Sequence, residues 1–408
     1  MKNIIISQAI KALDDYLKNY SKYISRENVL TLAEGIPGAV ILYNEIKPFL
    51  SNNEIKYFEE ALITKIIKEF NKRETFDLGL WSGLCGINTS LILLNSFNDL
   101  EDVISDLQQV IENECENFFN YLESKDCQEI NYGDFDLFSG LTGILKYLLY
   151  SNQKNILKDI KLLERGKNIF INFINDECLD GKPKFFISNK NMIGNLKNSF
   201  KEGGIILGAA HGIASFISVL ISLYQRELIN EQTLKKSLTL LQKEYTFTLN
   251  KNNAFVILNN NDCNYNLGVN NSWCYGLPGI LPALLKSLIY SNNLTLREGV
   301  KKSLATWNLK EIGNTIDMNS DIFCHGKAGI LYSSLLINEF NFETGQLPKI
   351  LFEELLKDIE YCSFKDTSEI PGEESIVKHG LLVGNLGVYL VLISYIKKER
   401  FKADWVFY

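Results

Sequence analysis

Cysteines and a histidine stand beside two short glycine-rich motifs in the second half of the sequence. Cys274 lies two residues before the first glycine of one motif, and Cys324 and His325 directly precede the first glycine of the next. Zinc binds cysteine sulfur and histidine nitrogen readily, and a catalytic zinc site keeps three protein ligands and one open position. If the two segments converge in the fold, these three residues form such a site, with one Zn2+ per chain. The competing interpretation is that they are buried packing residues, as most lone cysteines and histidines are.

Two further residues in the same register could move protons. His211 directly precedes the first glycine of an earlier motif, and Asp136 precedes the first glycine of the motif before that by four residues. A histidine paired with a carboxylate is a common arrangement for proton transfer. The alternatives are a capping or core histidine and an aspartate that serves as a helix N-cap. His379 lies out of this register, and we expect a structural role for it.

The motif that accompanies these residues recurs seven times. It reads Gly, two residues, Gly (Ser in one copy), then a strongly apolar run, and its first glycines are 48 to 72 residues apart. The copies are Gly35–Gly38, Gly83–Gly86, Gly140–Gly143, Gly212–Ser215, Gly276–Gly279, Gly326–Gly329 and Gly384–Gly387. A single copy would carry no information, but seven copies that are each followed by an apolar run indicate a repeat architecture.

Two kinds of helix are predicted in each repeat. Runs such as 144–150, 280–289 and 388–395 are apolar on nearly all sides, as helices buried between neighbours are. Segments such as 54–69 and 102–122 are amphipathic with helical spacing. Each repeat therefore pairs a polar-faced outer helix with an apolar inner helix.

The uneven spacing, and a motif near each end of the chain, favour closure into a ring over an open solenoid. We predict an all-α fold, an α/α toroid (barrel) of seven two-helix repeats that occupies residues 1–408 as a single domain. The starts of the inner helices then converge on one mouth of the central cavity. The longest interval between motifs predicts a small strand-containing insertion, an inserted subdomain around residues 158–205.

The composition excludes several classes of protein. With 42 Lys and Arg against 49 Asp and Glu, the net charge of −7 argues against nucleic-acid binding. No apolar run reaches the roughly 18 residues of a membrane span, and the N-terminal run is too short for a signal peptide. We expect a cytoplasmic protein, in which eight cysteines without a CxxC pair are thiols or metal ligands rather than disulfides.

The sequence resembles the lanthionine synthetase C family over essentially its whole length. The resemblance rests on the seven repeats, on the block Trp273-Cys274-Tyr275-Gly276-Leu277-Pro278-Gly279 and on the block Cys324-His325-Gly326. It implies an α/α toroid with a central zinc ion and a cyclase of class I lantibiotic biosynthesis. Such enzymes add cysteine thiols to dehydroalanine and dehydrobutyrine in a dehydrated precursor peptide, which closes lanthionine and methyllanthionine thioether rings.

The resemblance also implies roles for particular residues. The family's zinc ligands correspond to Cys274, Cys324 and His325, and its acid/base histidine corresponds to His211. The aspartate proposed to assist that histidine corresponds to Asp136, and the tyrosine after the first zinc ligand to Tyr275. Members often carry an arginine where this sequence has Asn270, which puts a charged role for that position in doubt.

The resemblance implies that the dehydrated precursor peptide is the substrate of this protein. In relatives with an insertion after the third repeat, the extra lobe is used in proposed peptide contacts, which suits 158–205. The sequence leaves open whether a dehydratase and an ABC transporter join the protein in a complex at the inner face of the cell membrane.

The chemistry of the residues agrees with a cyclase. Only the thiolate of a cysteine is a good nucleophile, and binding to zinc removes the thiol proton near neutral pH. Addition to the alkene leaves an enolate that needs a proton, for which His211 is the candidate donor and Asp136 its partner. No organic cofactor is required.

Two alternatives stay open. Protein prenyltransferases also use zinc to activate a peptide thiol in an α/α barrel, but they need a cationic diphosphate pocket, and the motif segments here are poor in Lys and Arg apart from Lys327. The second alternative resembles the eukaryotic relatives of this family: a zinc-dependent thiol-binding or glutathione-binding protein without cyclase activity. Only a cyclase consumes peptide thiols without a change in mass.

Overall fold

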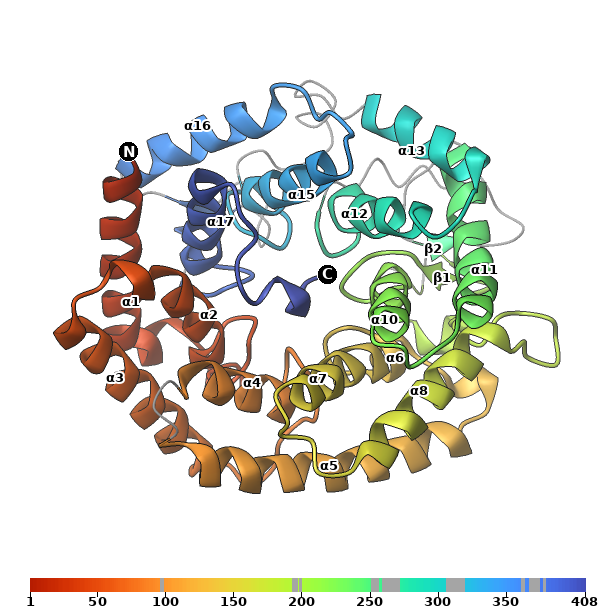
Figure 1. The fold of residues 1–408 in the computed structure, drawn as a ribbon, viewed down its shortest axis with the longest axis horizontal. Helices are drawn as coiled ribbons and strands as arrows, with labels where there is room; N and C mark the ends of the chain where they lie inside the picture. Colours follow the sequence, from red (N-terminus) through yellow and green to blue (C-terminus); the bar gives the residue numbers. More distant parts are fainter. Residues whose placement is uncertain are drawn as a thin grey trace. The chain divides into compact units, whose positions relative to one another are not determined.

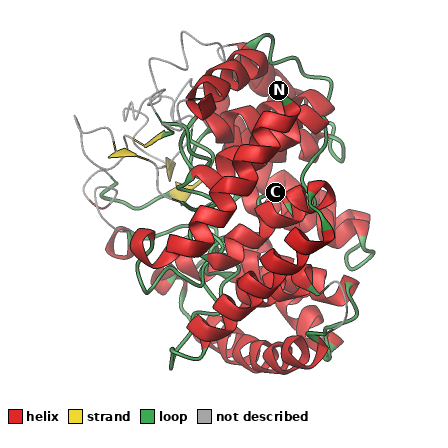
Figure 2. Ribbon diagram, turned by 90° about the vertical axis from the view of Figure 1, so that its left-hand side faces the viewer, coloured by secondary structure: helices red, strands yellow, loops and turns green. Residues whose placement is uncertain are grey.

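The computed structural model describes residues 1–95, 99–192, 197, 200–250, 257–258, 272–305, 320–360, 364–366, 375–376 and 379–408. Asn270, Cys263 and Cys362 lie outside these residues. The regular secondary structure of the described residues is almost entirely helical, with a few two-residue strands (Figure 2). None of its described helices is long and apolar enough to cross a membrane.

The contacts divide the chain into two compact units. The first unit comprises Met1–Ile111, Asp317–Leu335 and Gly345–Val406, and the second comprises Glu112–Ile316, Leu336–Thr344 and Phe407–Tyr408. The interpretation of residues 1–408 as a single domain stays a prediction.

The first unit contains two layers of helices. Its described elements are α1 (Lys2–Tyr23), α2 (Ile36–Ile46), η1 (Lys47–Phe49), α3 (Asn52–Phe70), α4 (Leu84–Leu94), the start of α5 (Glu101–Ser124), most of α15 (Lys327–Glu339), α16 (Leu347–Glu360), β3 (Lys365–Asp366), β4 (Ser375–Ile376), α17 (Asn385–Lys397) and η4 (Asp404–Val406). Helix α2 packs between α4 and α17, while α1, α3 and α16 lie against this apolar layer. Strands β3 and β4 pair antiparallel.

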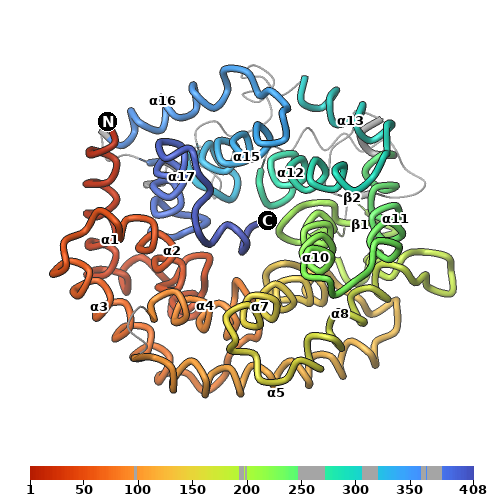
Figure 3. The backbone as a smooth tube through the Cα atoms, in the orientation of Figure 1, coloured from red at the N-terminus to blue at the C-terminus, as the bar shows by residue number. Residues whose placement is uncertain are grey.

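The second unit repeats this design. Its described elements are the rest of α5, η2 (Cys127–Glu129), α6 (Tyr132–Phe135), α7 (Leu141–Gln153), α8 (Ile160–Asn175), η3 (Asn189–Asn191), β1 (Ile205–Ile206), α10 (Ala214–Gln225), α11 (Glu231–Asn250), β2 (Ile257–Leu258), α12 (Leu277–Leu288) and α13 (Leu294–Ala305). Helix α10 packs against α7 and α12, and α8, α11 and α13 form a second layer on them (Figure 1). The backbone alternates between the two layers along the sequence (Figure 3).

The two kinds of helix follow from their sequences. Helix α3 begins with a capping box, in which Ser51 and Glu54 each accept the other's backbone N–H, and it buries Phe58, Leu62 and Ile66 along one stripe. Helix α17 instead buries every residue from Leu386 to Ser394. The predicted alternation of amphipathic and apolar helices is thus confirmed.

The motif glycines make room for the loop that precedes each apolar helix. In four motifs the residue after the first glycine donates its N–H, over 2.8–3.0 Å, to the carbonyl seven residues earlier, in the pairs Ile36–Val29, Leu84–Asp77, Ile213–Ile206 and Lys327–Ser320. This bond satisfies a helix N-terminal amide that has no partner within the helix. The loop thereby crosses so close to the helix that a Cβ on the second glycine would collide with a loop carbonyl, as it would at Gly38, Gly86, Gly279 and Gly387.

Backbone hydrogen bonds also join these loops from one repeat to the next, and we call this set the inter-repeat ladder. In the first unit it consists of Cys324 N–H to Leu382 O (3.0 Å), Leu382 N–H to Ala33 O (2.8 Å) and Leu32 N–H to Trp81 O (3.0 Å). In the second unit it consists of Leu137 N–H to Ala210 O (3.0 Å) and Ala210 N–H to Cys274 O (3.1 Å). Residues just before the motif glycines of neighbouring repeats are therefore held side by side within each unit.

The glycine packing leads to a stability prediction. We expect Gly387→Ala to lower the free energy of unfolding by about 1–3 kcal/mol, because the added methyl group overlaps the Leu381 carbonyl. Gly380→Ala, in the same unit, is the matched control with a smaller expected loss, since the nearest atom to its methyl group would lie 3.3 Å away. Equilibrium unfolding in urea measures both. Equal losses in the two variants would contradict this account of the motif.

Residues 158–205, for which an inserted subdomain stays a prediction, begin with a helix. Residues Ile160–Asn175 form α8, whose apolar stripe packs on α7 and α11 as in any other repeat. After α8, isolated bridges pair Glu177 with Pro183 and Ile187 with Gly204. Strand β1 pairs antiparallel with β2.

A disulfide joins Cys127 and Cys178 in the second unit, with the two Cα atoms 5.9 Å apart. The expectation that the cysteines are thiols or metal ligands rather than disulfides is wrong for this pair. The two cysteines are 51 residues apart in sequence. Arg165 of α8 also joins these parts of the chain, since it bonds to Glu123 and Asn120 of α5. The expectation came from the redox conditions of the cytoplasm, which do not indicate which cysteines lie close together in the fold. Cys85, Cys115, Cys274 and Cys324 are in no disulfide.

Candidate functional site

Asp136 and His211 form a pair in the second unit. Asp136 follows α6, His211 precedes α10, and the carboxylate Oδ2 lies 2.6 Å from His211 Nδ1. The neighbouring residues Leu137 and Ala210 share a bond of the inter-repeat ladder, which fixes the two side chains next to each other. The side chain of Asp136 is 2% exposed and that of His211 is 21% exposed, so the imidazole has access to solvent and the carboxylate has very little.

The second oxygen of Asp136 holds the loop that leads into α7. Its Oδ1 accepts the N–H groups of Ser139 (2.8 Å) and Gly140 (3.0 Å). Asp136 therefore holds this turn and pairs with His211 at the same time. It is the residue after α6, and Gly140 is the N-cap of α7, so Asp136 is not the helix N-cap of the alternative interpretation. Its part in proton transfer stays a prediction. An ionised carboxylate only accepts hydrogen bonds, so His211 donates from Nδ1 and keeps Nε2 for another partner.

Three aromatic rings surround His211. The ring centroids of Tyr132, Phe138 and Tyr275 lie 5.3, 4.8 and 5.5 Å from that of the imidazole. Burial, and then the charge of Asp136, raises the pKa of the Tyr132 phenol, so that this hydroxyl stays protonated at neutral pH. Tyr132 and Phe138 were not predicted from the sequence, although both lie within four residues of Asp136, which could have drawn attention to them.

Cys274 lies on the loop next to His211. Its carbonyl accepts the Ala210 N–H, its thiol donates to Ser272 Oγ over 3.4 Å, and its side chain is buried. The preceding Trp273 packs edge-on against Phe407, and Tyr408 donates its hydroxyl to Pro278 O over 3.1 Å. The second unit thus brings Asp136, His211, Tyr275 and the Cys274 loop together.

Cys324 and His325 lie in the first unit, just before α15, and both are half-buried. The three predicted zinc ligands are therefore divided between the units. Within the described residues of either unit alone, no three His, Cys, Asp or Glu side chains form a group that could hold a metal. Two thiols and an imidazole, each on a loop of the same backbone design, have the donor chemistry that suits zinc. The zinc site stays a prediction.

His379 ties the last motif to α1. Its Nδ1 lies 3.0 Å from Asn385 Oδ1 and its Nε2 lies 3.0 Å from Asp15 Oδ2, and its ring packs edge-on against Tyr23. These contacts within the first unit agree with the structural role expected for this histidine.

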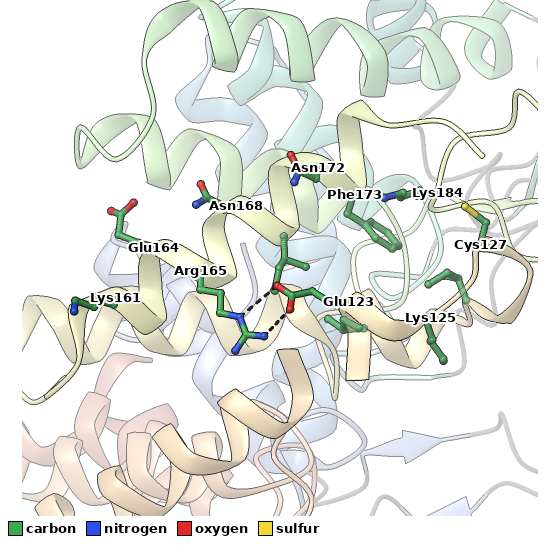
Figure 4. A pocket seen from close by; sticks show the side chains of 13 residues that line it. Glu123, Lys125, Cys127, Lys161, Glu164, Arg165, Asn168, Asn172, Phe173 and Lys184 are labelled. Carbon is green, nitrogen blue, oxygen red and sulfur yellow. Dashed lines mark hydrogen bonds and ion pairs between the residues drawn. The ribbon is translucent and has the colours of Figure 1, made fainter. Parts of the chain in front are cut away.

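A groove of about 540 Å3 lies elsewhere in the second unit, between α8 and the end of α5 (Figure 4). Lys161, Arg165 and Asn168 line its α8 side, and Glu123, bonded to Arg165, lines the other. None of the predicted site residues lines this groove.

Comparison with known proteins agrees with the two-layered helical repeats and the loop-borne residues. The family model of lanthionine synthetase C-like proteins matches residues 26–408. The chain belongs to this family. Among its curated relatives, this lanthionine synthetase C-like protein is 23% identical to the nisin biosynthesis protein NisC of Lactococcus lactis subsp. lactis, over 90% of its own length and 85% of that protein.

The fold of this lanthionine synthetase C-like protein is similar to that of a solved structure, a nisin cyclase. The two match with a TM-score of 0.75 at 22% identity, over 100% of this chain and 98% of the other. The match confirms the predicted fold class, an all-α α/α toroid.

Proposed function

We propose that this protein is a zinc-dependent lanthionine synthetase of lantibiotic biosynthesis. It adds the cysteine thiols of a dehydrated precursor peptide to dehydroalanine and dehydrobutyrine, and so closes lanthionine and methyllanthionine rings. The observation that carries the proposal is the Asp136–His211 pair, placed by the inter-repeat ladder beside the Cys274 loop. The family match and the two relatives named for nisin biosynthesis support it.

Cys274, Cys324 and His325 would hold the zinc ion. When bound, zinc would supply a deprotonated substrate thiol near neutral pH. Three protein ligands, the rule in catalytic zinc sites, would leave one position for that thiol.

His211 and Asp136 would manage the proton. Attack of the sulfur on the β-carbon forms the C–S bond and leaves an enolate, which takes a proton at its α-carbon. His211 would take up the proton that the substrate thiol releases and deliver it to the α-carbon from Nε2, because Nδ1 is held by Asp136. Asp136 cannot rotate away, since its other oxygen is bound to two backbone amides. The rings of Tyr132, Phe138 and Tyr275 limit the access of water to the imidazole.

The substrate follows from this reaction, and the other partners are those that the family resemblance implies. The dehydrated precursor peptide is the proposed substrate, with a cytoplasmic location for the protein. A dehydratase and an ABC transporter are the proposed further members of a complex at the inner face of the membrane.

The test is ring closure on a dehydrated precursor peptide. Purified zinc-loaded protein is incubated with the peptide, and remaining thiols are alkylated and counted by mass spectrometry. We expect the number of alkylated thiols to fall while the mass of the unalkylated peptide stays unchanged. Thiols that persist, with the peptide or glutathione bound, would contradict the proposal and favour a thiol-binding protein without cyclase activity.

A further inference from the structure

A buried lysine stands at the start of α15, immediately after Cys324-His325-Gly326. The side chain of Lys327 is only 9% exposed. Two physical effects oppose a cation in this place: the N-terminus of a helix carries a partial positive charge, and a buried ammonium group loses its hydration. A lysine that stays charged in spite of both effects needs acidic side chains close to its ammonium group.

Lys327 has three acidic partners, all in the first unit. Its Nζ lies 2.6 Å from Asp321 Oδ1, 3.4 Å from Asp358 Oδ2 and 4.0 Å from Glu354 Oε2. The side chain of Asp321 is 1% exposed and comes from the loop before the motif, whereas Glu354 and Asp358 lie one turn apart on α16. Lys327 therefore ties the loop to two helices.

The same loop is closed by its backbone. Lys327 N–H donates to Ser320 O over 2.9 Å, and Ala328 N–H donates to Asp321 O over 3.2 Å. Cys324 and His325 lie within the segment that these bonds enclose. The Asp321–Lys327 ion pair joins the two ends of the segment a second time, through side chains.

We propose that the Asp321–Lys327 ion pair is a positioning element that holds the Cys324–His325 loop in the conformation in which both side chains present their metal-binding atoms. Glu354 and Asp358 secure Lys327 from α16. Neither Asp321 nor Lys327 is a catalytic residue. That the metal is zinc rests on the proposed function. That the ion pair orders the loop does not depend on the proposed function.

A second buried ion pair in the first unit provides the control. Lys397 Nζ of α17 lies 2.7 Å from Glu45 Oε2 of α2, with side chains 19% and 4% exposed. Glu45 is nine residues beyond the start of α2, which is about 14 Å along the helix at 1.5 Å per residue. Breaking this pair should affect stability without affecting the loops at the helix starts.

The experiment compares Lys327→Met, Asp321→Asn and Lys397→Met with the wild type in three measurements. These are the zinc dissociation constant by competition with a chromogenic chelator, amide hydrogen exchange of residues 320–328 in zinc-free protein, and the melting temperature. We expect Lys327→Met and Asp321→Asn to weaken zinc binding about 10-fold or more, as loss of residues that orient metal ligands does, and to speed exchange in 320–328. Lys397→Met should lower the melting temperature and leave the other two measurements at wild-type values.

The outcomes separate this inference from the proposed function. Wild-type zinc affinity and exchange in both Lys327→Met and Asp321→Asn would overturn the positioning role, and so would equal weakening in Lys397→Met. If the wild type binds no zinc, the metal of the proposed function is wrong, and hydrogen exchange alone decides the inference. If Lys327→Met does not fold, Asp321→Asn, which keeps the shape of the side chain, decides it.

Discussion

Cys274→Ala is expected to remove zinc from the purified protein and to abolish ring closure on the dehydrated peptide. A site with three protein ligands that loses one thiolate loses its charge balance and a strong bond, and the substrate sulfur then has no metal to bind. The same result is expected for Cys324→Ala. The helical content should largely persist, because both residues lie on loops and the layers of helices pack without them.

Cys85→Ala is the matched control for this prediction. Cys85 is a fully buried cysteine inside another motif and is in no disulfide, so its loss affects packing but not the proposed ligand set. Elemental analysis should find one zinc per chain in Cys85→Ala and none in the other two variants. Full zinc occupancy in Cys274→Ala or Cys324→Ala would remove these cysteines from the metal site.

His211→Asn is expected to slow ring closure by about 10²- to 10⁴-fold in folded, zinc-loaded protein, the usual contribution of a general acid. Asparagine retains polarity and approximate size but cannot deliver a proton to the enolate. Asp136→Asn should slow the reaction less, since an amide oxygen can still accept the Ser139 and Gly140 N–H groups while the charge that stabilises the imidazolium is lost. Thiol alkylation with mass detection follows both rates.

His379→Asn controls for the loss of a histidine as such. His379 also bonds through both ring nitrogens, to Asn385 and Asp15, but in the first unit and out of register with the motif glycines. This variant should be less stable yet close rings at the wild-type rate per folded molecule. A wild-type rate in His211→Asn, with matching zinc content and circular dichroism, would show that another group delivers the proton.

Much of the fold could be predicted because it depends on local patterns. The capping box and apolar stripe of α3, and the continuous apolar run of α17, specify helix type without reference to the rest of the chain. The repeated glycines mark where each apolar helix starts, and at Gly38, Gly86, Gly279 and Gly387 only a residue without a Cβ fits under the crossing loop. The proximity of Asp136 and His211 followed from their shared register beside these glycines.

The features that were missed depend on contacts between distant segments. Cys127 and Cys178 are 51 residues apart in sequence, and their pairing depends on how the segments after α5 and α8 lie in the fold. The sequence shows Lys327 only as an isolated cation. Its proposed role depends on its ion pairs with Asp321 and with two residues of α16. Hydrophobic periodicity shows which face of a helix is apolar. It does not show which other segment of the chain packs against that face.

The inter-repeat ladder bears on how far such a sequence can diverge. Its bonds join main-chain N–H and C=O groups, which every residue except proline supplies in full. Substitution of the side chains on these loops therefore leaves the links between repeats intact, provided that the motif glycines keep the loops close to the helices. Links of this kind do not depend on side-chain identity, which is compatible with a TM-score of 0.75 at only 22% identity to the matched nisin cyclase.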